Sequence, residues 1–226
     1  MERNDGKRAL VIGASGGIGG AVCAALEARG WAVTGLSRSG EGLDVTDAGS
    51  VARHLGALEG EFDLILVATG ALEIDGARPE KTIRDVTPAA MAAQFALNTI
   101  GPALVLQQAP KLLPRRQRAV LAVLSARVGS IGDNRLGGWY SYRVAKAGAN
   151  QLVHGFAIEL ARSHAQAICV ALHPGTVSTE FTRNYQDRHA TVTPAQSAEN
   201  LLSVIDGLTP DQTGGFFDWA GKAVPW

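Results

Sequence analysis

The sequence predicts a single α/β domain with a doubly wound parallel sheet of about seven strands and helices on both faces. Along the 226 residues, short apolar runs of strand length alternate with longer stretches in which alanine and leucine recur at helical spacing. The short runs are apolar throughout rather than alternating with polar residues, which is typical of parallel strands covered on both faces. The length suits one globular unit, so we treat residues 1–226 as one domain.

The individual elements follow from length and apolar character. The predicted strands are residues 8–13, 32–37, 42–45, 62–68, 119–125, 167–172 and 215–218. The predicted helices are residues 17–29, 47–58, 88–113, 142–163 and 194–208, with Thr46 as the expected N-cap of the second. Parallel sheets of this kind bind ligands beyond the carboxyl ends of their strands, so functional residues are expected directly after the strands.

Charge and composition exclude several classes of partner. The 21 basic and 21 acidic residues give zero formal net charge, whereas nucleic acids and anionic membrane surfaces attract a basic excess. In the sequence, no apolar stretch approaches the ~20 residues that span a bilayer, and we expect no membrane partner. Cys23 and Cys169 lie in apolar runs, and the first residues lack an apolar signal stretch, so a cytoplasmic location is expected. The five histidines show no metal-ligand spacing, and no metal is expected.

The sequence is rich in glycine, with 27 glycines in 226 residues, and several of them follow the first predicted strand. There the spacing is Gly-x-x-x-Gly-x-Gly at Gly13, Gly17 and Gly19. Glycines at a strand-to-helix turn let backbone N–H groups approach a pyrophosphate at the positive end of the helix. We therefore expect a dinucleotide-binding, Rossmann-like turn, although a merely flexible turn is the alternative. The predicted contacts within this turn are Gly13, Ser15, Gly16, Gly17, Ile18 and Gly19.

The end of the second strand indicates which dinucleotide is bound. An acidic residue there favours NAD, whereas Ser37 followed by Arg38 suits the 2′-phosphate of NADP. We therefore expect NADP(H) in preference to NAD(H), with an ordinary solvated arginine as the alternative. Asp44 and Val45 are expected near the adenine, and the segment Ala68-Thr69-Gly70 is expected to let the cofactor pass close to the backbone.

Tyr142 and Lys146 form a candidate acid/base pair. They are four residues apart in an alanine-rich predicted helix, so their side chains share one face. A nearby ammonium and a cationic nicotinamide lower the pKa of a phenol, which otherwise titrates near 10. Tyr142 can then protonate a carbonyl oxygen while hydride reaches the carbonyl carbon. Chance pairs on solvated helices are the alternative, and the glycine-rich turn weighs against that alternative.

With these motifs together, the sequence resembles the short-chain dehydrogenase/reductase family, and within it the C-factor-like, sniffer-type carbonyl reductases. The resemblance covers essentially the whole chain. The matching motifs are Gly13, Gly17 and Gly19 in the turn, Ala68-Thr69-Gly70 in place of an Asn-Asn-Ala-Gly segment, Asn98, Tyr142 with Lys146, and Pro174 to Thr179.

The resemblance implies a role for each matched residue. Lys146 would hold the nicotinamide ribose and lower the pKa of Tyr142. The backbone carbonyl of Asn98 would hold a water that continues a proton relay, while a locally bonded helix asparagine is the alternative. The nicotinamide segment would bind the cofactor through Pro174, Gly175, Val177 and Thr179. The resemblance also implies a homodimer, with a tetramer as the alternative, formed through long helices with small residues such as Ala145, Ala147, Gly148 and Ala149.

The sequence departs from the family pattern at one position. The family serine that bonds the substrate oxygen stands three residues before the position of Gly129, where this chain has Ala126. Neighbouring strand residues point to opposite faces, so Ser125 replaces that serine only if the end of the strand redirects it. Ser125 is the predicted catalytic hydroxyl, and Ser130 is the more distant alternative. Losing one such donor costs about 10²–10³ in rate, which slows an enzyme without abolishing catalysis.

The predicted function is an NADP(H)-dependent carbonyl reductase or alcohol dehydrogenase that acts on a small carbonyl or alcohol substrate. The rival prediction is a catalytically weak NADP-binding sensor on the same fold, which Ala126 favours and the Tyr142–Lys146 pair opposes. Substrate identity is not readable from the chain. The short polar segment 181–193, in the place of the family's substrate lid, indicates an open site.

Overall fold

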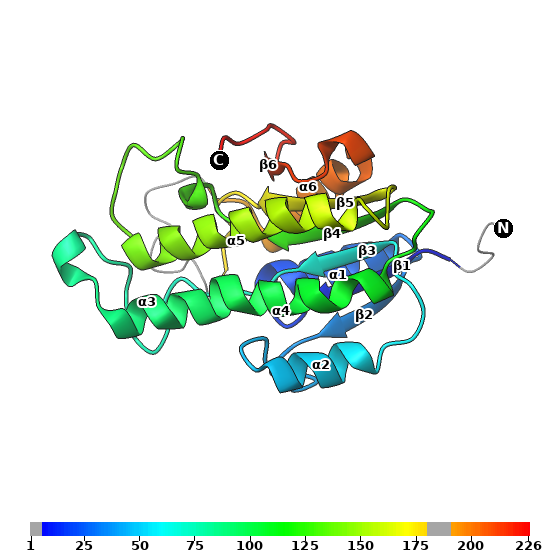
Figure 1. The fold of residues 1–226 in the computed structure, drawn as a ribbon, viewed down its shortest axis with the longest axis horizontal. Coiled ribbons are helices and arrows are strands. Elements are labelled where there is room, and N and C mark those ends of the chain that lie inside the picture. The colour runs from blue at the N-terminus through cyan, green and yellow to red at the C-terminus, as the bar shows by residue number, and fades with distance from the viewer. Residues whose placement is uncertain (1–5, 180–190) are drawn as a thin grey trace.

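The computed structural model describes residues 6–179 and 191–226, which are built around one parallel sheet (Figure 1). The sheet has six strands in the order β2-β1-β3-β4-β5-β6, and every neighbouring pair is parallel. The strands are β1 Arg8–Ile12, β2 Ala32–Leu36, β3 Leu64–Val67, β4 Ala119–Leu124, β5 Ala167–His173 and β6 Phe216–Asp218. The predicted parallel α/β sheet is confirmed.

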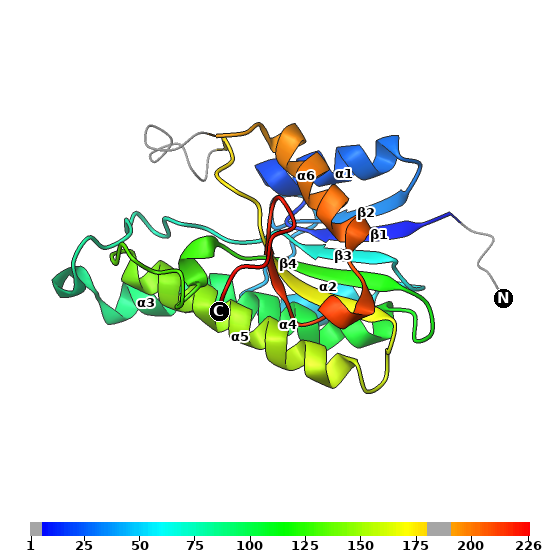
Figure 2. The same ribbon diagram turned by 90° about the horizontal axis from the view of Figure 1, so that it is seen from above.

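Helices cover both faces of the sheet (Figure 2). One face carries α1 (Gly17–Ala28) and α6 (Pro194–Gly207), and the other carries α2 (Ala48–Gly56), α4 (Gly101–Gln108) and α5 (Tyr140–Leu160). Alternate residues of β4 enter the two cores: Leu121 packs toward α4 and α5, and Val120 packs toward α1 and α6. Since both faces of each central strand are buried, the strands need no polar side, as their sequence indicated.

The predicted third strand, residues 42–45, is wrong. After β2 the chain turns, with the Leu43 N–H donating to the Ser37 carbonyl at 3.0 Å, and it leaves the sheet at β2, which pairs only with β1. Leu43 and Val45 are nevertheless buried, because they pack into the core on the α2 and α4 face. Their apolar pattern therefore records burial without strand pairing, and the sheet has six strands rather than seven.

Two helix predictions also change in detail. Asp47, not Thr46, caps α2, because its carboxylate accepts hydrogen bonds from the N–H groups of Gly49 and Ser50. The predicted helix 88–113 is a chain of segments: α3 (Pro88–Phe95), a π-helical turn (Ala96–Ile100), α4, and a 3₁₀ turn (Ala109–Leu112). The π-turn adds a residue to one turn and so changes which residues face α5.

By length and composition alone, the apolar run Pro88–Leu112 is suitable for crossing a membrane, which differs from the expectation that no apolar stretch has this length. In this fold the run is a core helix, since Val105, Leu106 and Leu112 are buried against the sheet.

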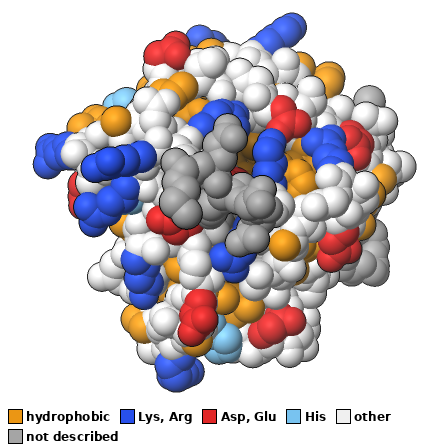
Figure 3. All heavy atoms as spheres, turned by 90° about the vertical axis from the view of Figure 1, so that its right-hand side faces the viewer, with side chains coloured by type: hydrophobic (Ala, Val, Ile, Leu, Met, Phe, Trp, Pro, Cys, Tyr) orange, Lys and Arg blue, Asp and Glu red, His pale blue; other side chains and the backbone are white. Residues whose placement is uncertain are grey.

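At the end of the molecule opposite the start of α5, basic and acidic side chains are mixed on the surface (Figure 3), consistent with the balanced charge. Among the described residues, no group of three or more His, Cys, Asp or Glu is placed to hold a metal.

Three of the four small residues expected at a dimer interface pack within the chain. Ala145 and Ala149 are 0% and 1% exposed, and a Cβ on Gly148 would lie 3.0 Å from the Thr99 side chain. These residues let α5 approach the π-turn closely, and the Thr99 hydroxyl donates to the Ala145 carbonyl at 2.7 Å. Packing within one chain therefore explains why these residues are small, and the homodimer stays a prediction.

Candidate active site

The carboxyl edge of the sheet brings together motifs that lie far apart in the sequence. A Cβ on Gly13 would lie 2.9 Å from the Ala68 carbonyl oxygen, so the ends of β1 and β3 touch there. A Cβ on Gly17 would lie 2.6 Å from the methyl group of Thr179, so the predicted nicotinamide segment lies over the glycine-rich turn. The glycine-rich turn, the end of β3 and Thr179 of the predicted nicotinamide segment therefore lie side by side.

The start of α1 is open to an anion. Gly16 is its N-cap and provides no side-chain hydrogen bond, and no acidic residue stands in the first turn. The first N–H groups of a helix have no partner within the helix, so this end offers donors and a positive dipole end. Ser15 and Gly16 are exposed beside it, and Ile18 is partly buried. At Gly19 a Cβ would lie 2.2 Å from the Gly13 carbonyl oxygen, so the turn requires glycine there.

The segment after β3 carries an unsatisfied hydroxyl. Within the described part of the chain, the buried Thr69 Oγ1 has no hydrogen-bond partner, and buried polar groups are nearly always bonded. A Cβ on the adjacent Gly70 would lie 2.7 Å from Asn98 Oδ1 and 3.4 Å from Lys146 Nζ. The unbonded Thr69 hydroxyl and the side-chain-free backbone at Gly70 thus lie between the glycine-rich turn and Lys146, where the predicted cofactor path runs.

Asn98 lies in the π-turn, fully buried, and its two functional groups have different roles. Its side chain clamps the backbone after β3: Nδ2 donates to the Ala71 carbonyl at 2.9 Å, and Oδ1 accepts from the Ala71 N–H at 3.3 Å. Its backbone carbonyl lacks the i+4 partner of a regular helix, because residue 102 is proline and has no N–H. The side chain therefore bonds locally, as the alternative expected, and a relay water on the carbonyl stays a prediction.

Tyr142 and Lys146 lie together on one face of α5, as their spacing predicted. Both are buried, with 5% and 4% of their surface exposed, and Lys146 Nζ lies 5.8 Å from the centroid of the Tyr142 ring. The ammonium donates to the Leu124 carbonyl at 3.1 Å, which fixes it at the end of β4. The Trp139 ring packs edge-on against the Tyr142 ring, with centroids 6.4 Å apart.

Burial acts on the two groups in opposite directions. It raises the pKa of the Tyr142 phenol and lowers the pKa of the Lys146 ammonium to about 8. In both cases the cause is loss of hydration around the charged form. The protein without cofactor therefore does not show the lowered pKa of Tyr142, which rested on a cationic nicotinamide beside the pair and stays a prediction.

The predicted adenosine end is shaped by a residue that the sequence did not reveal, Glu41. Its Oε2 accepts hydrogen bonds from the N–H of Ser37 at 2.7 Å and from the hydroxyl of Ser37 at 3.1 Å. These bonds lower the pKa of the Glu41 carboxyl. Ser37 thus presents two donors to an anion, and the next residue, Arg38, is exposed beside them.

The other two predicted adenosine contacts are engaged elsewhere. The Asp44 carboxylate accepts hydrogen bonds from the hydroxyl and the N–H of Thr46, and these bonds lower its pKa. Val45 is 5% exposed and faces Gly101, where a Cβ would lie 2.9 Å from its methyl group. Contact of either residue with adenine stays a prediction.

None of the candidate hydroxyls replaces the family serine directly. The Ser125 hydroxyl donates to Asn150 Oδ1 at 2.5 Å, and Asn150 stands eight residues beyond Tyr142 on α5. Eight residues of helix span about 12 Å, so this hydroxyl faces a lower part of α5 than the phenol does. Ser130 donates to the Pro225 carbonyl. Ala126 precedes the 3₁₀ turn Arg127–Gly129 and has no polar side chain. A catalytic Ser125 stays a prediction that requires its hydroxyl to leave Asn150.

The predicted nicotinamide segment follows β5. Gly175 has a φ of 79°, and a Cβ there would lie 3.0 Å from the Trp219 ring. The Pro174 carbonyl accepts from the Ser197 hydroxyl at 3.3 Å, and Val177 pairs with Val192. His173, just before the segment, has a buried Nδ1 without a partner among the described residues, and burial lowers its pKa to about 4. Residues 181–190 of the predicted lid lie outside the described residues.

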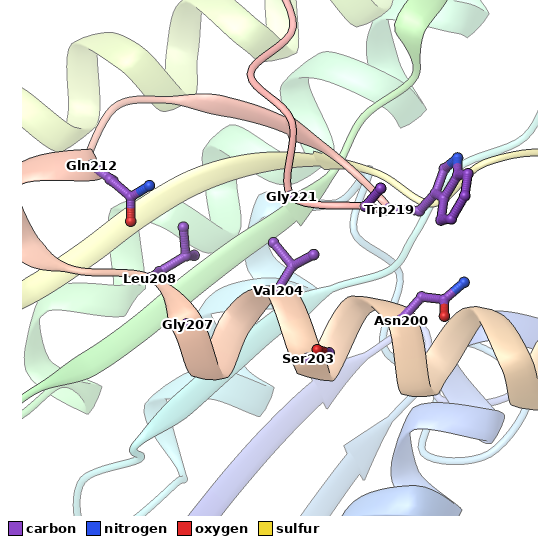
Figure 4. A pocket seen from close by; sticks show the side chains of 9 residues that line it. Asn200, Ser203, Val204, Gly207, Leu208, Gln212, Trp219 and Gly221 are labelled. Carbon is purple, nitrogen blue, oxygen red and sulfur yellow. The ribbon is translucent and has the colours of Figure 1, made fainter.

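Two hollows lie near these elements. A small one of about 10 Å³ adjoins Tyr142 and is also lined by Glu80, Gln94 and Ser141. A larger one of about 370 Å³ lies between α6 and the C-terminal segment (Figure 4) and contains none of the predicted catalytic residues. Trp219 lines the larger hollow and also contacts Gly175, so this hollow borders the nicotinamide segment from outside.

Known proteins resemble this chain in sequence and in structure. The model of a family described as enoyl-(acyl carrier protein) reductase matches residues 13–207. A 1-hydroxy-2-glutathionyl-2-methyl-3-butene dehydrogenase of Rhodococcus sp. (strain AD45) is 32% identical over 234 residues, which cover 96% of this chain and 98% of that one. The C-signal protein of Myxococcus xanthus is 37% identical over 145 residues, 63% of this chain and 82% of that one. The crystal structure of an NADPH-bound carbonyl reductase from chicken fatty liver is 26% identical with a TM-score of 0.81, covering 98% and 99% of the two chains.

Proposed function

The chain belongs to the short-chain dehydrogenase/reductase family, and from that premise we propose that it is an NADP(H)-dependent carbonyl reductase or alcohol dehydrogenase. The observation that carries the proposal is the buried Tyr142–Lys146 pair at the carboxyl edge of the sheet, beside the bare strip at Gly70. The similar proteins include an NADPH-bound carbonyl reductase and a dehydrogenase of a hydroxy compound. Interconversion of a carbonyl and an alcohol fits both relatives.

The residues present fit a dinucleotide. The uncapped start of α1 receives the pyrophosphate, and the unpartnered Thr69 hydroxyl and the bare Gly70 lie along the path toward Lys146. When bound, the reduced nicotinamide supplies a hydride to the carbonyl carbon. Tyr142 donates the phenolic proton to the carbonyl oxygen, which completes the alcohol. Lys146 holds the nicotinamide ribose, and its positive charge stabilises the phenolate that remains.

The phenolate then regains a proton from solvent through groups around Asn98. In this proposal the Asn98 carbonyl, to which Pro102 offers no i+4 donor, holds a water within reach of the Lys146 side chain. The substrate oxygen meets no hydroxyl from residue 126, so Tyr142 is its main donor. We accordingly propose a slower enzyme than one that has a second donor, by the usual effect of about 10²–10³.

A catalytically weak sensor is not favoured. Its sequence argument was Ala126, and the C-signal relative bears a signalling name. A sensor has no chemical need, however, for a buried phenol and ammonium that are held against the cofactor path. The structure keeps both groups in place, with Lys146 anchored on β4.

Turnover of a carbonyl by NADPH is expected to fall as the pH rises through about 8. Below the depressed pKa of about 8, Lys146 is an ammonium and supports proton donation, and above it the charge is lost. Tyr142, whose pKa is raised, keeps its proton over this range, so Lys146 sets the alkaline limb. The measurement is kcat/KM against pH, which reports groups of the free enzyme. A flat profile up to about pH 10, where an ordinary lysine titrates, would contradict this assignment, and recovery of activity on return to neutral pH controls for unfolding.

Replacing Glu41 by alanine is expected to strengthen NADPH binding by about five- to tenfold and leave NADH binding unchanged. The Glu41 carboxylate holds both Ser37 donors, so a 2′-phosphate must displace it from Ser37, which directly precedes Arg38. Both bonds are charge-assisted, but Glu41 is exposed and solvent screens its charge, so the expected gain is limited to about five- to tenfold. Titration calorimetry with both cofactors checks the prediction, with Glu59→Ala, an exposed carboxylate elsewhere, as the control. Weaker NADPH binding in Glu41→Ala would contradict it.

The proposal as a whole is tested by following NADPH consumption with a panel of ketones and aldehydes, beside the same panel with NADH. Consumption with NADPH and formation of the alcohol support the proposal. A clear preference for NADH would overturn the interpretation of Ser37 and Arg38. Turnover of an α,β-unsaturated thioester alone would overturn the carbonyl assignment.

A further inference from the structure

The described helices differ in how their first turns are capped. The helices α2, α3 and α6 each begin at a side chain of their own that accepts backbone hydrogen bonds: Asp47, Thr87 and Thr193. Three helices begin without such a side chain: α1 at Gly16, α4 at Ile100, where it continues the π-helical turn, and α5 at Trp139. For α1 the open end faces the cofactor path. For α5, which carries Tyr142, the missing cap requires another explanation.

The chain enters α5 through a strained backbone. Gly137, Gly138 and Trp139 have φ values of 63°, 65° and 54°, and such a conformation is uncommon for a residue with a side chain. The Trp139 N–H donates to the Glu80 carbonyl oxygen at 2.6 Å, a bond that spans almost sixty residues of sequence. Left-handed geometry at Trp139 thus persists because a distant segment holds it.

The side chain of Glu80 holds the next turn. Its Oε2 accepts from the Ser141 N–H at 3.2 Å, and its Oε1 accepts from the Ser141 hydroxyl. Glu80 is 6% exposed, so these bonds lie in a poorly hydrated place where they are stronger than on the surface. A carboxylate at the first turn also interacts favourably with the helix dipole.

We propose that Glu80 is a positioning residue for Tyr142: it caps α5 from a distance and thereby fixes the direction of the catalytic phenol. Tyr142 is the third residue of α5 and directly follows Ser141, which Glu80 holds. Its ring rests on Trp139, the residue held by the Glu80 carbonyl. The same hollow of about 10 Å³ touches Glu80, Ser141 and Tyr142. The proposal rests on the proposed reductase function only in naming Tyr142 as the proton donor.

The effect is expected on turnover more than on cofactor binding. A shift of about 1 Å in a reacting group costs on the order of 10²-fold in rate, whereas the phosphate-binding turn lies on α1 and is not held by Glu80. Glu80→Ala removes both side-chain bonds and is expected to lower kcat by about 10- to 100-fold. Glu80→Gln retains a neutral acceptor and is expected to recover part of that loss. The NADPH dissociation constant is expected to stay within about twofold in both variants.

The experiment combines steady-state kinetics and NADPH titration with hydrogen exchange on the full chain. Exchange is expected to rise in Glu80→Ala at the first turn of α5 and to stay unchanged at α1. Asp85→Asn is the matched control, because Asp85 is an exposed carboxylate that accepts a hydrogen bond from the Thr82 N–H in the same connecting segment. It is expected to change neither kcat nor exchange at α5.

Two results would overturn the proposal: full turnover by a folded Glu80→Ala variant, or a loss of NADPH affinity as large as the loss of kcat. Failure of the reductase function itself has a different signature, in which the wild-type chain binds NADPH and reduces no carbonyl. In that case hydrogen exchange decides the matter. A local rise at the first turn of α5 supports the capping role of Glu80, and unchanged exchange refutes it.

Discussion

Tyr142→Phe is expected to lower kcat for carbonyl reduction by about 10³-fold while the NADPH dissociation constant stays within a few-fold. The substitution removes only the phenolic oxygen, and a positioned general acid contributes about 10²–10⁴ in rate. The ring itself is buried and packs against Trp139, so phenylalanine fills the same space. Pre-steady-state and steady-state NADPH oxidation, with cofactor titration by fluorescence, measure the two quantities separately.

Tyr140→Phe is the matched control for that substitution. Tyr140 is the first residue of α5 and lies two positions before Tyr142, on another side of the helix. Removing its hydroxyl tests whether any phenol at the start of α5 affects turnover, and wild-type activity is expected. Wild-type turnover in Tyr142→Phe would show that another group supplies the proton and would overturn the mechanism.

Gly19→Ala is expected to weaken NADPH binding at least 100-fold and to lower the melting temperature. The new Cβ would lie 2.2 Å from the Gly13 carbonyl oxygen and 3.3 Å from the Ala14 Cα, both backbone atoms that cannot rotate away. Either α1 moves off the turn or the turn opens, and both changes displace the N–H groups that face the pyrophosphate. Calorimetric titration and thermal unfolding measure the two effects.

Gly155→Ala provides the control for a glycine-to-alanine change. Gly155 lies within α5, and a Cβ there meets no atom within 4 Å. Alanine in a helix interior is more favourable than glycine by roughly 0.5–1 kcal/mol, so a slightly raised melting temperature and unchanged NADPH binding are expected. Gly19→Ala with wild-type affinity would contradict the close approach on which the cofactor assignment depends.

Local patterns were sufficient to predict the sheet, because a buried parallel strand has a distinctive run of apolar residues. The same rule failed at residues 42–45, since Leu43 and Val45 are buried without a strand partner. Apolar character reports burial, and pairing depends on whether a neighbouring strand edge is within reach. The long helix was predicted as one element, although Pro102 marked the place where its hydrogen-bond ladder changes.

Within the site, the predictions that succeeded rest on short-range geometry. The spacing of Tyr142 and Lys146 fixes a shared helix face whatever the rest of the fold. Glu41 and Glu80 were missed for opposite reasons. Glu41 lies four residues after Ser37 in a turn, where composition does not show which way a carboxylate folds back. Glu80 acts about sixty residues away in sequence, and only the packed structure brings it to Ser141.

The alternation of side chains along a strand predicts the face on which Ser125 lies but not the partner of its hydroxyl. Strand periodicity placed its side chain on the face opposite to that of residue 126, and the structure places it against Asn150 of α5. The sequence correctly indicated that position 126 lacks a hydroxyl. It did not indicate the hydrogen-bond partner of Ser125, because that partner, Asn150, lies on α5 and is brought to the end of β4 only by the packing of the helix on the sheet.

The central claim is that this chain moves a hydride between NADPH and a carbonyl carbon with Tyr142 as the proton donor. The most direct measurement uses NADPH that carries deuterium at both C4 positions of the nicotinamide, with a reducible ketone or aldehyde, and analyses the product by mass spectrometry. We predict one deuterium on the carbinol carbon, one NADP⁺ formed per alcohol, and formation of both products about 10³-fold more slowly in Tyr142→Phe. Tight NADPH binding with no deuterated alcohol from any carbonyl in the panel would contradict the account.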